Sequence, residues 1–484
     1  MVTWIYKPIF WLGVLSILLV IYSVFRAANL SMTHDESHTF LAFHTQPIWP
    51  CFFSTHCWET ANNHLLNTLL MQQSVRWFGV SELTIRLPNV LGQVVFLGYS
   101  IAIVRLFTWP FLTALAAFVL LNFNPYLIDF FGLARGYGLS VAFFLAAIYY
   151  LLIYIKVPWP GLRPLLGLYV SGFLSIMANF TALNFIFCLS CLQVSCSVYL
   201  VWSQKINLRK VFGPLIIPVF FGLLLFFLLK LPISVLKEKG EFLYGAASAW
   251  DTLKILAQDI LYGQNYLGGQ TILCFLLFIL LGLIASIFLA IYYFKFSNAV
   301  TILPLVLCGL GLGAFSLMII QHLWLDSSYL FNRKAILFIP AFTLMLISGL
   351  NQLRPVYQRV MSLVILTLLS WHLLRCLNSS FCREWWYDKN TKTVMWELNS
   401  KVKESEQPIT LGTNWLFMPT AEFYRVTLKM DQIAPLVYDK SIQGDGRFDF
   451  YFIDYNDWPI LQSNYEKIME FDSGSRFLLQ KKKE

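Results

Sequence analysis

Eleven long apolar runs, separated by short polar turns, constrain this chain more than any other feature of its sequence. A helix needs about 20 mostly apolar residues to cross a bilayer, and a lone strand or loop cannot cross because its backbone polar groups need internal partners. The sequence therefore predicts an all-α polytopic membrane domain of about 11 transmembrane helices. The spans are expected at about 8–27, 86–106, 110–128, 138–155, 165–178, 181–202, 211–231, 270–294, 299–320, 335–350 and 360–377.

Charge divides the chain into two parts. The tail from Asn378 onward has 14 Lys and Arg against 16 Asp and Glu, whereas the rest has 21 against 10. We predict a membrane domain over 1–377 and a soluble domain over 378–484. Within the tail, the pattern predicts a strand over 408–415, a helix over 420–428 and a strand over 448–453, which together indicate a small α/β domain. The basic residues punctuate apolar runs and do not form one surface, which argues against a nucleic-acid partner.

The segment Leu65–Gly79 is apolar but contains amides and a basic residue, so we predict an interfacial helix and not a span. With that choice and a cytoplasmic N-terminus, the inner turns are short, basic and free of acidic residues, as the positive-inside rule expects. The soluble tail then lies on the outer side. The inner basic residues are Lys7, Arg105, Lys156, Arg163, Lys205, Arg209, Lys210, Lys295, Arg354 and Arg359.

Two predicted outer loops are long, at about 28–85 and 231–270. Cys51 and Cys57 lie in the first loop, where an oxidising compartment would permit a disulfide between them. The second loop contains Tyr244 and Tyr262 and is a candidate lid over the site.

The first outer loop begins with a run of histidines and acids, namely His34, Asp35, Glu36 and His38. Two carboxylates beside a bilayer are costly unless they are solvated or used. Asp35, with Glu36 as the second choice, could act as a general base on an acceptor hydroxyl. The alternative is a polar loop in which Asp35 caps a short helix. The histidines, with His64, also leave a divalent metal site open.

Further candidate site residues follow along the chain. Four residues precede or begin the interfacial helix and could bind sugar hydroxyls or simply cap that helix: Asn62, Asn63, His64 and Asn67. A second set lies at predicted outer helix ends, where cations could bind a phosphate headgroup or could extend to ordinary lipid headgroups. Its members are Arg86, Arg135, Tyr137, Arg333 and Lys334.

Together these pieces resemble the GT-C membrane glycosyltransferases, in particular the branch of the protein O-mannosyltransferases and the lipid A aminoarabinose transferases. The order of the motifs carries the resemblance through the whole membrane part. The chain differs at Asn63-His64-Leu65, where relatives usually have Lys-Pro or His-Pro. The matching motifs are Asp35-Glu36, Phe78-Gly79, Glu82 through Arg86-Leu-Pro88, Ala134-Arg-Gly-Tyr137 and Arg333 through Pro340.

The resemblance implies an inverting glycosyltransferase that moves a monosaccharide from a polyprenyl-phosphate donor to a lipid, glycan or protein acceptor of the cell envelope. It implies a periplasmic or lumenal site, no cofactor, and Asp35 as the base. The short loops favour a bacterial inner membrane. A transporter or flippase of lipid-linked sugars is the alternative, although such proteins place polar residues near the midplane. A membrane scaffold whose tail binds a partner would leave the first-loop cluster unexplained.

Overall fold

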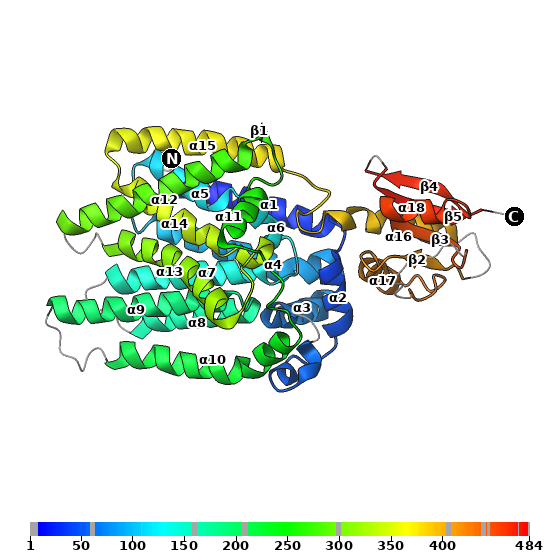
Figure 1. The fold of residues 1–484 in the computed structure, drawn as a ribbon, viewed down its shortest axis with the longest axis horizontal. Coiled ribbons are helices and arrows are strands. Elements are labelled where there is room, and N and C mark those ends of the chain that lie inside the picture. The colour runs from blue at the N-terminus through cyan, green and yellow to red at the C-terminus, as the bar shows by residue number, and fades with distance from the viewer. Residues whose placement is uncertain are drawn as a thin grey trace. The chain divides into compact units, whose positions relative to one another are not determined.

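The structure, a computed structural model, describes residues 8–58, 63–107, 109–156, 162–204, 212–296, 302–402, 408–436, 442, 446–472 and 474–482. It has two compact units (Figure 1). Unit 1 comprises Met1–Phe25, Pro47–Leu70 and Arg86–Leu377. Unit 2 comprises Arg26–Gln46, Met71–Ile85 and Asn378–Glu484. Compactness does not show which part folds alone, so the predicted domains at 1–377 and 378–484 stay predictions.

Long apolar helices make up unit 1. Two further helices, α3 (Leu65–Phe78) and α4 (Glu82–Val104), are divided between the units, and so is the first helix, whose residues from Arg26 onward belong to unit 2. Short elements complete unit 1: η2 (Trp49–Phe52), η3 (Thr55–Trp58), β1 (Tyr266–Gly269) and η6 (Asn332–Ala335). The other helices are α1 (Pro8–Asn29), α5 (Phe111–Asn122), α6 (Pro125–Phe131), α7 (Tyr137–Lys156), α8 (Leu162–Ala178), α9 (Ala182–Gln204), α10 (Phe212–Glu238), α11 (Ala249–Ile260), α12 (Thr271–Phe296), α13 (Ile302–Leu325), α14 (Phe338–Gln352) and α15 (Pro355–Cys376).

Packing inside unit 1 follows the apolar faces of these helices. Helix α7 packs against α8, α13 against α9 and α14, α12 against α14, and α15 against α5 (Figure 1). Helices α5 and α6 form one bent pair with an angle of 64° between them. The bend has a local cause, because Pro125 cannot donate a backbone hydrogen bond and keeps Asn124 extended. The Asn124 side chain then caps α6 by accepting from Leu127 N at 3.0 Å.

The prediction of a polytopic helical membrane protein with a small C-terminal α/β part is confirmed. The predicted number of 11 spans is not. Within the described chain, eight helices are long and apolar enough to cross a membrane, the bent pair makes a ninth, and α8 and α14 are shorter. Helix α3 has 14 residues, which is about 21 Å at about 1.5 Å per residue and shorter than a bilayer core of about 30 Å. Its length therefore agrees with a helix that does not span.

A four-stranded sheet in the order β2-β3-β5-β4 forms the centre of the C-terminal segment of unit 2. Strand β2 (Leu411–Thr413) is parallel to β3 (Phe450–Asp454), and β5 (Arg476–Lys481) is antiparallel to both β3 and β4 (Tyr465–Phe471). Four of the five residues of β3 are buried, as expected for a central strand that is covered on both faces. The predicted strands over 408–415 and 448–453 correspond to β2 and β3.

Helices and first-loop residues complete unit 2. Helix α17 (Met418–Thr427) corresponds to the predicted helix over 420–428, and it packs against both α16 (Thr391–Val402) and α2 (His34–Phe43). Shorter helical segments are η7 (Trp386–Asn390), η8 (Tyr455–Asp457) and α18 (Trp458–Leu461). The packing of α2 on α17 joins two segments that are almost 400 residues apart in sequence, as the Met32–Tyr424 hydrogen bond, which spans 392 positions, shows.

Candidate active site

The acid pair lies in the first turn of α2, in unit 2. Thr33 is the N-cap, and a capping box joins it to Glu36. Thr33 N donates to Glu36 Oε2 at 3.0 Å, and Glu36 N donates to Thr33 Oγ1 at 3.4 Å. Asp35 is 6% exposed and Glu36 is fully buried. Thr33 and Glu36 therefore cap the N-terminus of α2. The alternative drawn from the sequence gave this role to Asp35.

His34 is attached to the C-terminal segment through both its backbone and its ring. Its amide donates to Asp388 Oδ2 at 2.6 Å. Its ring Nδ1 lies 2.9 Å from the carbonyl oxygen of Leu416, and since a carbonyl only accepts, Nδ1 carries the proton. The ring also meets Trp415 edge to face at 5.6 Å. Burial raises the pKa of the Asp388 carboxyl well above its usual range, although the hydrogen bond from His34 acts in the opposite direction.

His38 lies one turn further along α2 and is half-buried. Among the residues that the structure describes, no group of three or more His, Cys, Asp or Glu side chains could hold a metal ion. Of the other predicted site residues, Asn62 lies outside the described residues.

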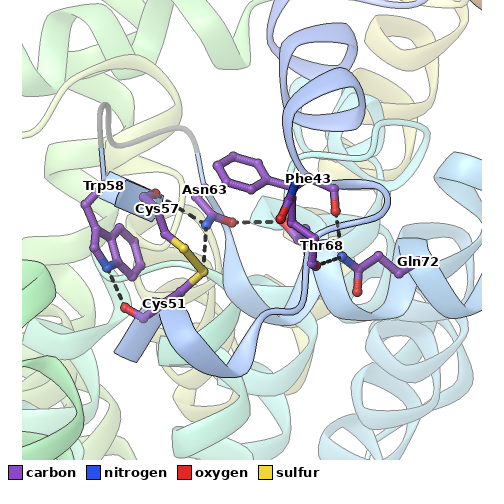
Figure 2. Close-up of a disulfide and its surroundings, with 8 residues drawn as sticks. Phe43, Cys51, Cys57, Trp58, Asn63, Thr68 and Gln72 are labelled. Carbon is purple, nitrogen blue, oxygen red and sulfur yellow. Dashed lines mark hydrogen bonds between the residues drawn. A yellow bond between two sulfur atoms is a disulfide. The ribbon is translucent and has the colours of Figure 1, made fainter. Parts of the chain in front are cut away.

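A disulfide between Cys51 and Cys57 organises the loop before α3, in unit 1. The loop hydrogen bonds are drawn in Figure 2: Trp58 Nε1 donates to Cys51 O at 2.7 Å, and Asn63 Nδ2 lies 3.5 Å from Cys57 O. Asn63 Oδ1 accepts from Thr68 Oγ1 at 3.1 Å (Figure 2). The Asn63 side chain thus joins the disulfide loop to the first turns of α3.

Asn67 connects three segments of unit 1. Its Nδ2 donates to Ala134 O at 2.9 Å, and its Oδ1 accepts from Asn89 Nδ2 at 2.6 Å. Asn89 Oδ1 in turn lies 3.3 Å from Leu139 N, in the first turn of α7. The side chains of Asn67 and Asn89 are both fully buried, where a lost hydrogen-bond partner is costly. The Asn67 amide holds the segment that carries Arg135.

His64 packs against the same segment. Its Nδ1 lies 3.0 Å from the carbonyl of Ala178, and its ring meets Tyr137 at 4.9 Å. Gly136 has a φ of +68°, and a Cβ there would lie 2.4 Å from Ala178 O. Only glycine fits this close approach at low cost. The structure thus brings His64, Asn67 and the Arg135–Tyr137 turn together. The sequence did not predict this arrangement.

Arg86 and Arg135 are fully or nearly fully buried in unit 1, with 0% and 1% of their surface exposed. A guanidinium is rarely buried without partners for its charge, so neither side chain resembles a cation that extends to bulk lipid headgroups. Both are therefore better candidates for binding an anion or a carboxylate inside the protein than for binding ordinary lipid headgroups.

Lys334 lies near Arg333 in η6, against the loop that follows α10. Its Nζ donates to Tyr244 O at 2.8 Å and lies 5.4 Å from the centre of that ring. Burial lowers the pKa of Lys334, and Arg333 lowers it further. The loop is also joined to this region by Ala246 N, which donates to Tyr329 O at 2.9 Å.

An apolar cavity of about 800 Å³ opens in unit 1 between α5, α11, α12, α14 and α15. Its lining includes Leu256, Phe278, Ala285, Phe342 and Leu368. One polar pair lies on its wall, where Tyr266 donates to His372 Nδ1 at 2.7 Å. The His372 Nε2 proton then goes to Ile260 O at 3.0 Å, which leaves both ring nitrogens occupied. The cavity suits a long hydrocarbon chain.

Sequence reasoning missed Asp388, Asn89 and this cavity. Asp388 lies among aromatic residues in Trp385-Trp386-Tyr387-Asp388, a setting in which an acid is often buried, and that was the available signal. Asn89 follows the Arg86-Leu-Pro88 motif directly. The cavity has no signal in one sequence, because its lining comes from five helices.

No protein-family model and no curated protein matches the chain. Among the solved structures that are similar to it are two of ArnT. The apo crystal structure of ArnT from Cupriavidus metallidurans shares 10% identity over 98% of both chains, with a TM-score of 0.51. The crystal structure of ArnT from the same organism bound to undecaprenyl phosphate shares 9% identity over 96% of this chain and 97% of that chain, with a TM-score of 0.49. ArnT is a GT-C lipid A aminoarabinose transferase. At this identity the likeness concerns the fold: the chain has the fold of the GT-C membrane glycosyltransferases.

Proposed function

We propose that the chain is an inverting glycosyltransferase that moves a monosaccharide from a polyprenyl-phosphate donor to a cell-envelope acceptor at the outer face of the membrane. The observation that carries the proposal is an acid pair in the first turn of α2, directly after the first span, in a chain with the GT-C fold. The disulfide between Cys51 and Cys57 supports an oxidising, outer location for the first loop.

Asp35 is the proposed base. Glu36 is the second choice, because its carboxylate accepts the backbone hydrogen bond of the α2 capping box. Asp35 takes the proton of the acceptor hydroxyl while the acceptor oxygen forms a bond to the anomeric carbon of the sugar. The bond from that carbon to the phosphate oxygen breaks, and polyprenyl phosphate leaves with the electron pair.

The cations are proposed to bind the phosphate. Arg135, Arg333 and Lys334 are the candidates, since negative charge grows on the leaving phosphate as the bond breaks. Arg135 lies in a turn that Asn67 and His64 hold in place, so its position is determined by packing. We propose that Asn67 holds the turn that carries Arg135, through its hydrogen bond to Ala134 O. The remaining candidates for orienting sugar or acceptor are His34, His38, Asn62, Asn63, His64, Arg86 and Tyr137.

The apolar cavity in unit 1 is the proposed site of the donor's hydrocarbon tail. Its volume of about 800 Å³ and its apolar lining suit several isoprene units. The sugar-linked form of a polyprenyl phosphate is the donor that we propose for this chain, and the polyprenyl phosphate itself is the leaving group.

Sugar transfer by purified protein in lipid vesicles tests the proposal, with radiolabelled polyprenyl-phosphate sugars and a membrane extract as the acceptor. Asp35→Asn should abolish transfer while donor binding persists. Glu36→Gln is the matched variant, because glutamine also completes a capping box, and it should retain most of the activity. Arg135→Ala should weaken donor use. If folded wild type transfers no sugar but moves labelled lipid between leaflets, the protein is a flippase and the proposal is wrong.

A further inference from the structure

Helix α2 is attached to the C-terminal segment of unit 2 at several points. Met32 N donates to the Tyr424 hydroxyl at 2.9 Å, just before the helix. Ser37 Oγ lies 3.5 Å from Thr420 Oγ1, and Phe40 meets Phe423 edge to face at 5.3 Å. These contacts lie on one face of α17. The helix that carries the acid pair is therefore held by residues that follow the last span by 40 positions or more.

Asp388 is a buried acid in this attachment. It is 1% exposed, and its Oδ2 accepts from the amide of His34 at 2.6 Å. His34 is the first residue of α2, so the bond satisfies one of the N–H groups that a helix start leaves without an internal partner. The other carboxyl oxygen lies 3.5 Å from Thr391 Oγ1. This oxygen accepts from the Thr391 hydroxyl, so Asp388 accepts at both carboxyl oxygens. An amide at this position would keep one oxygen that can accept from the helix N–H.

We propose that Asp388 is a positioning residue for the acid pair, and that orienting α2 is a function of the C-terminal segment. This inference rests on the proposed function, since it takes Asp35 as the base. Asp388 accepts from the backbone immediately before Asp35, at His34 N. A carboxylate base that moves by about 1 Å can lose about 100-fold in rate, so the single bond at the helix start has leverage over the chemical step.

Two substitutions of Asp388 separate positioning from chemistry. Asp388→Asn keeps an oxygen acceptor for His34 N, so transfer should stay within about threefold of wild type. Asp388→Ala removes the acceptor, and kcat should fall by about tenfold or more while the KM for the donor changes little. Tyr424→Phe removes the acceptor of Met32 N one residue before the cap, and it gives a milder second test if Asp388→Ala does not fold.

Hydrogen exchange of the α2 amides provides a readout that does not depend on activity. Asp388→Ala should raise the exchange rate of amides 34–40 by about tenfold, whereas Asp388→Asn should not. Asp449→Ala is the control, because Asp449 also accepts backbone and hydroxyl hydrogen bonds in the same segment, from Thr410 at 2.8 and 2.7 Å. It should leave both the α2 amides and kcat unchanged.

The outcomes distinguish this inference from the proposed function. If exchange in α2 does not respond to Asp388→Ala, Asp388 does not position the helix and the inference is wrong. If Asp388→Asn is as inactive as Asp388→Ala while α2 exchanges as in wild type, the carboxylate has a chemical role and the inference is again wrong. If wild type transfers no sugar but α2 loosens in Asp388→Ala, the proposed function fails and the attachment of α2 stands.

Discussion

The phenol of Tyr262 donates to the carboxylate of Asp129, with 2.9 and 3.1 Å between the phenol oxygen and the two carboxylate oxygens. Tyr262 is 5% exposed and has a backbone φ of 54°, which a non-glycine residue adopts at some cost. The bond therefore holds the end of the loop after α11 against α6. This part of the predicted lid is an anchored segment in the structure, whereas Tyr244, at the other end of the loop, is 71% exposed.

Tyr262→Phe should destabilise the protein by about 1.5–3 kcal/mol, the range for a lost hydrogen bond to a charged group. The midpoint of thermal unfolding in detergent measures this loss of stability. Tyr244→Phe is the control, since it keeps the ring that contacts Phe331, and it should melt within error of wild type. Equal midpoints for the two variants would contradict the assigned role of the Tyr262 hydroxyl.

Gly136→Ala should destabilise the protein by about 2 kcal/mol or more, because the new Cβ would meet Ala178 O at 2.4 Å and His64 Cβ at 2.9 Å at a positive φ. It should also reduce transfer, since the Arg135 turn must shift. Gly98→Ala serves as the control: the structure shows nothing within 4 Å of its Cβ, and alanine favours a helix. Thermal melts and transfer rates should separate the two variants.

The fold was predictable where a residue's neighbours are local in sequence. Apolar runs predicted the long membrane helices although not their number, and the mixed pattern of the tail predicted β2, β3 and α17. The site was predictable only in residue type. His34 and Asp35 are candidates chosen from their sequence, but the contact of His34 with Asp388 joins positions 354 apart. Asn67 was interpreted as a cap or a sugar ligand, because nothing in the sequence shows that Ala134 and Asn89 lie beside it. Such partners depend on packing that one sequence does not reveal.

Reduction of the Cys51–Cys57 disulfide should destabilise the protein by about 2 kcal/mol, as loop-closure entropy predicts for a ring this small. It should also loosen Asn63, whose amide faces this loop. Thermal melts with and without dithiothreitol measure the effect. Cys191→Ser, at an exposed free cysteine, should respond to the reductant as wild type does, and the double variant Cys51→Ser with Cys57→Ser should not respond. A response in the double variant would assign the effect to another cysteine.

Stability should depend on pH through Asp388. Burial raises its pKa in the folded protein, Asp35 raises it further, and Arg476 lowers it. The neutral acid is thus favoured by folding, so its contribution is fully present below the unfolded pKa of about 4 and is lost as pH rises toward the folded value. The melting midpoint of wild type relative to Asp388→Asn should therefore fall as pH rises from 4 to 7. Parallel curves would show that Asp388 does not titrate abnormally.

Filling the apolar cavity should impair long-chain donors selectively. Ala285 lines the cavity, and Ala285→Trp would displace part of a bound hydrocarbon chain. Each CH₂ that stays in water costs about 0.8 kcal/mol, so the loss of even two such groups raises the KM for a long polyprenyl-phosphate sugar about tenfold. A donor with only two isoprene units should be affected less, because fewer of its CH₂ groups can be displaced. Ile284→Trp is the matched control, since Ile284 is 62% exposed and does not line the cavity. A rise in KM that is equal for both donors, or equal in both variants, would place the donor tail elsewhere.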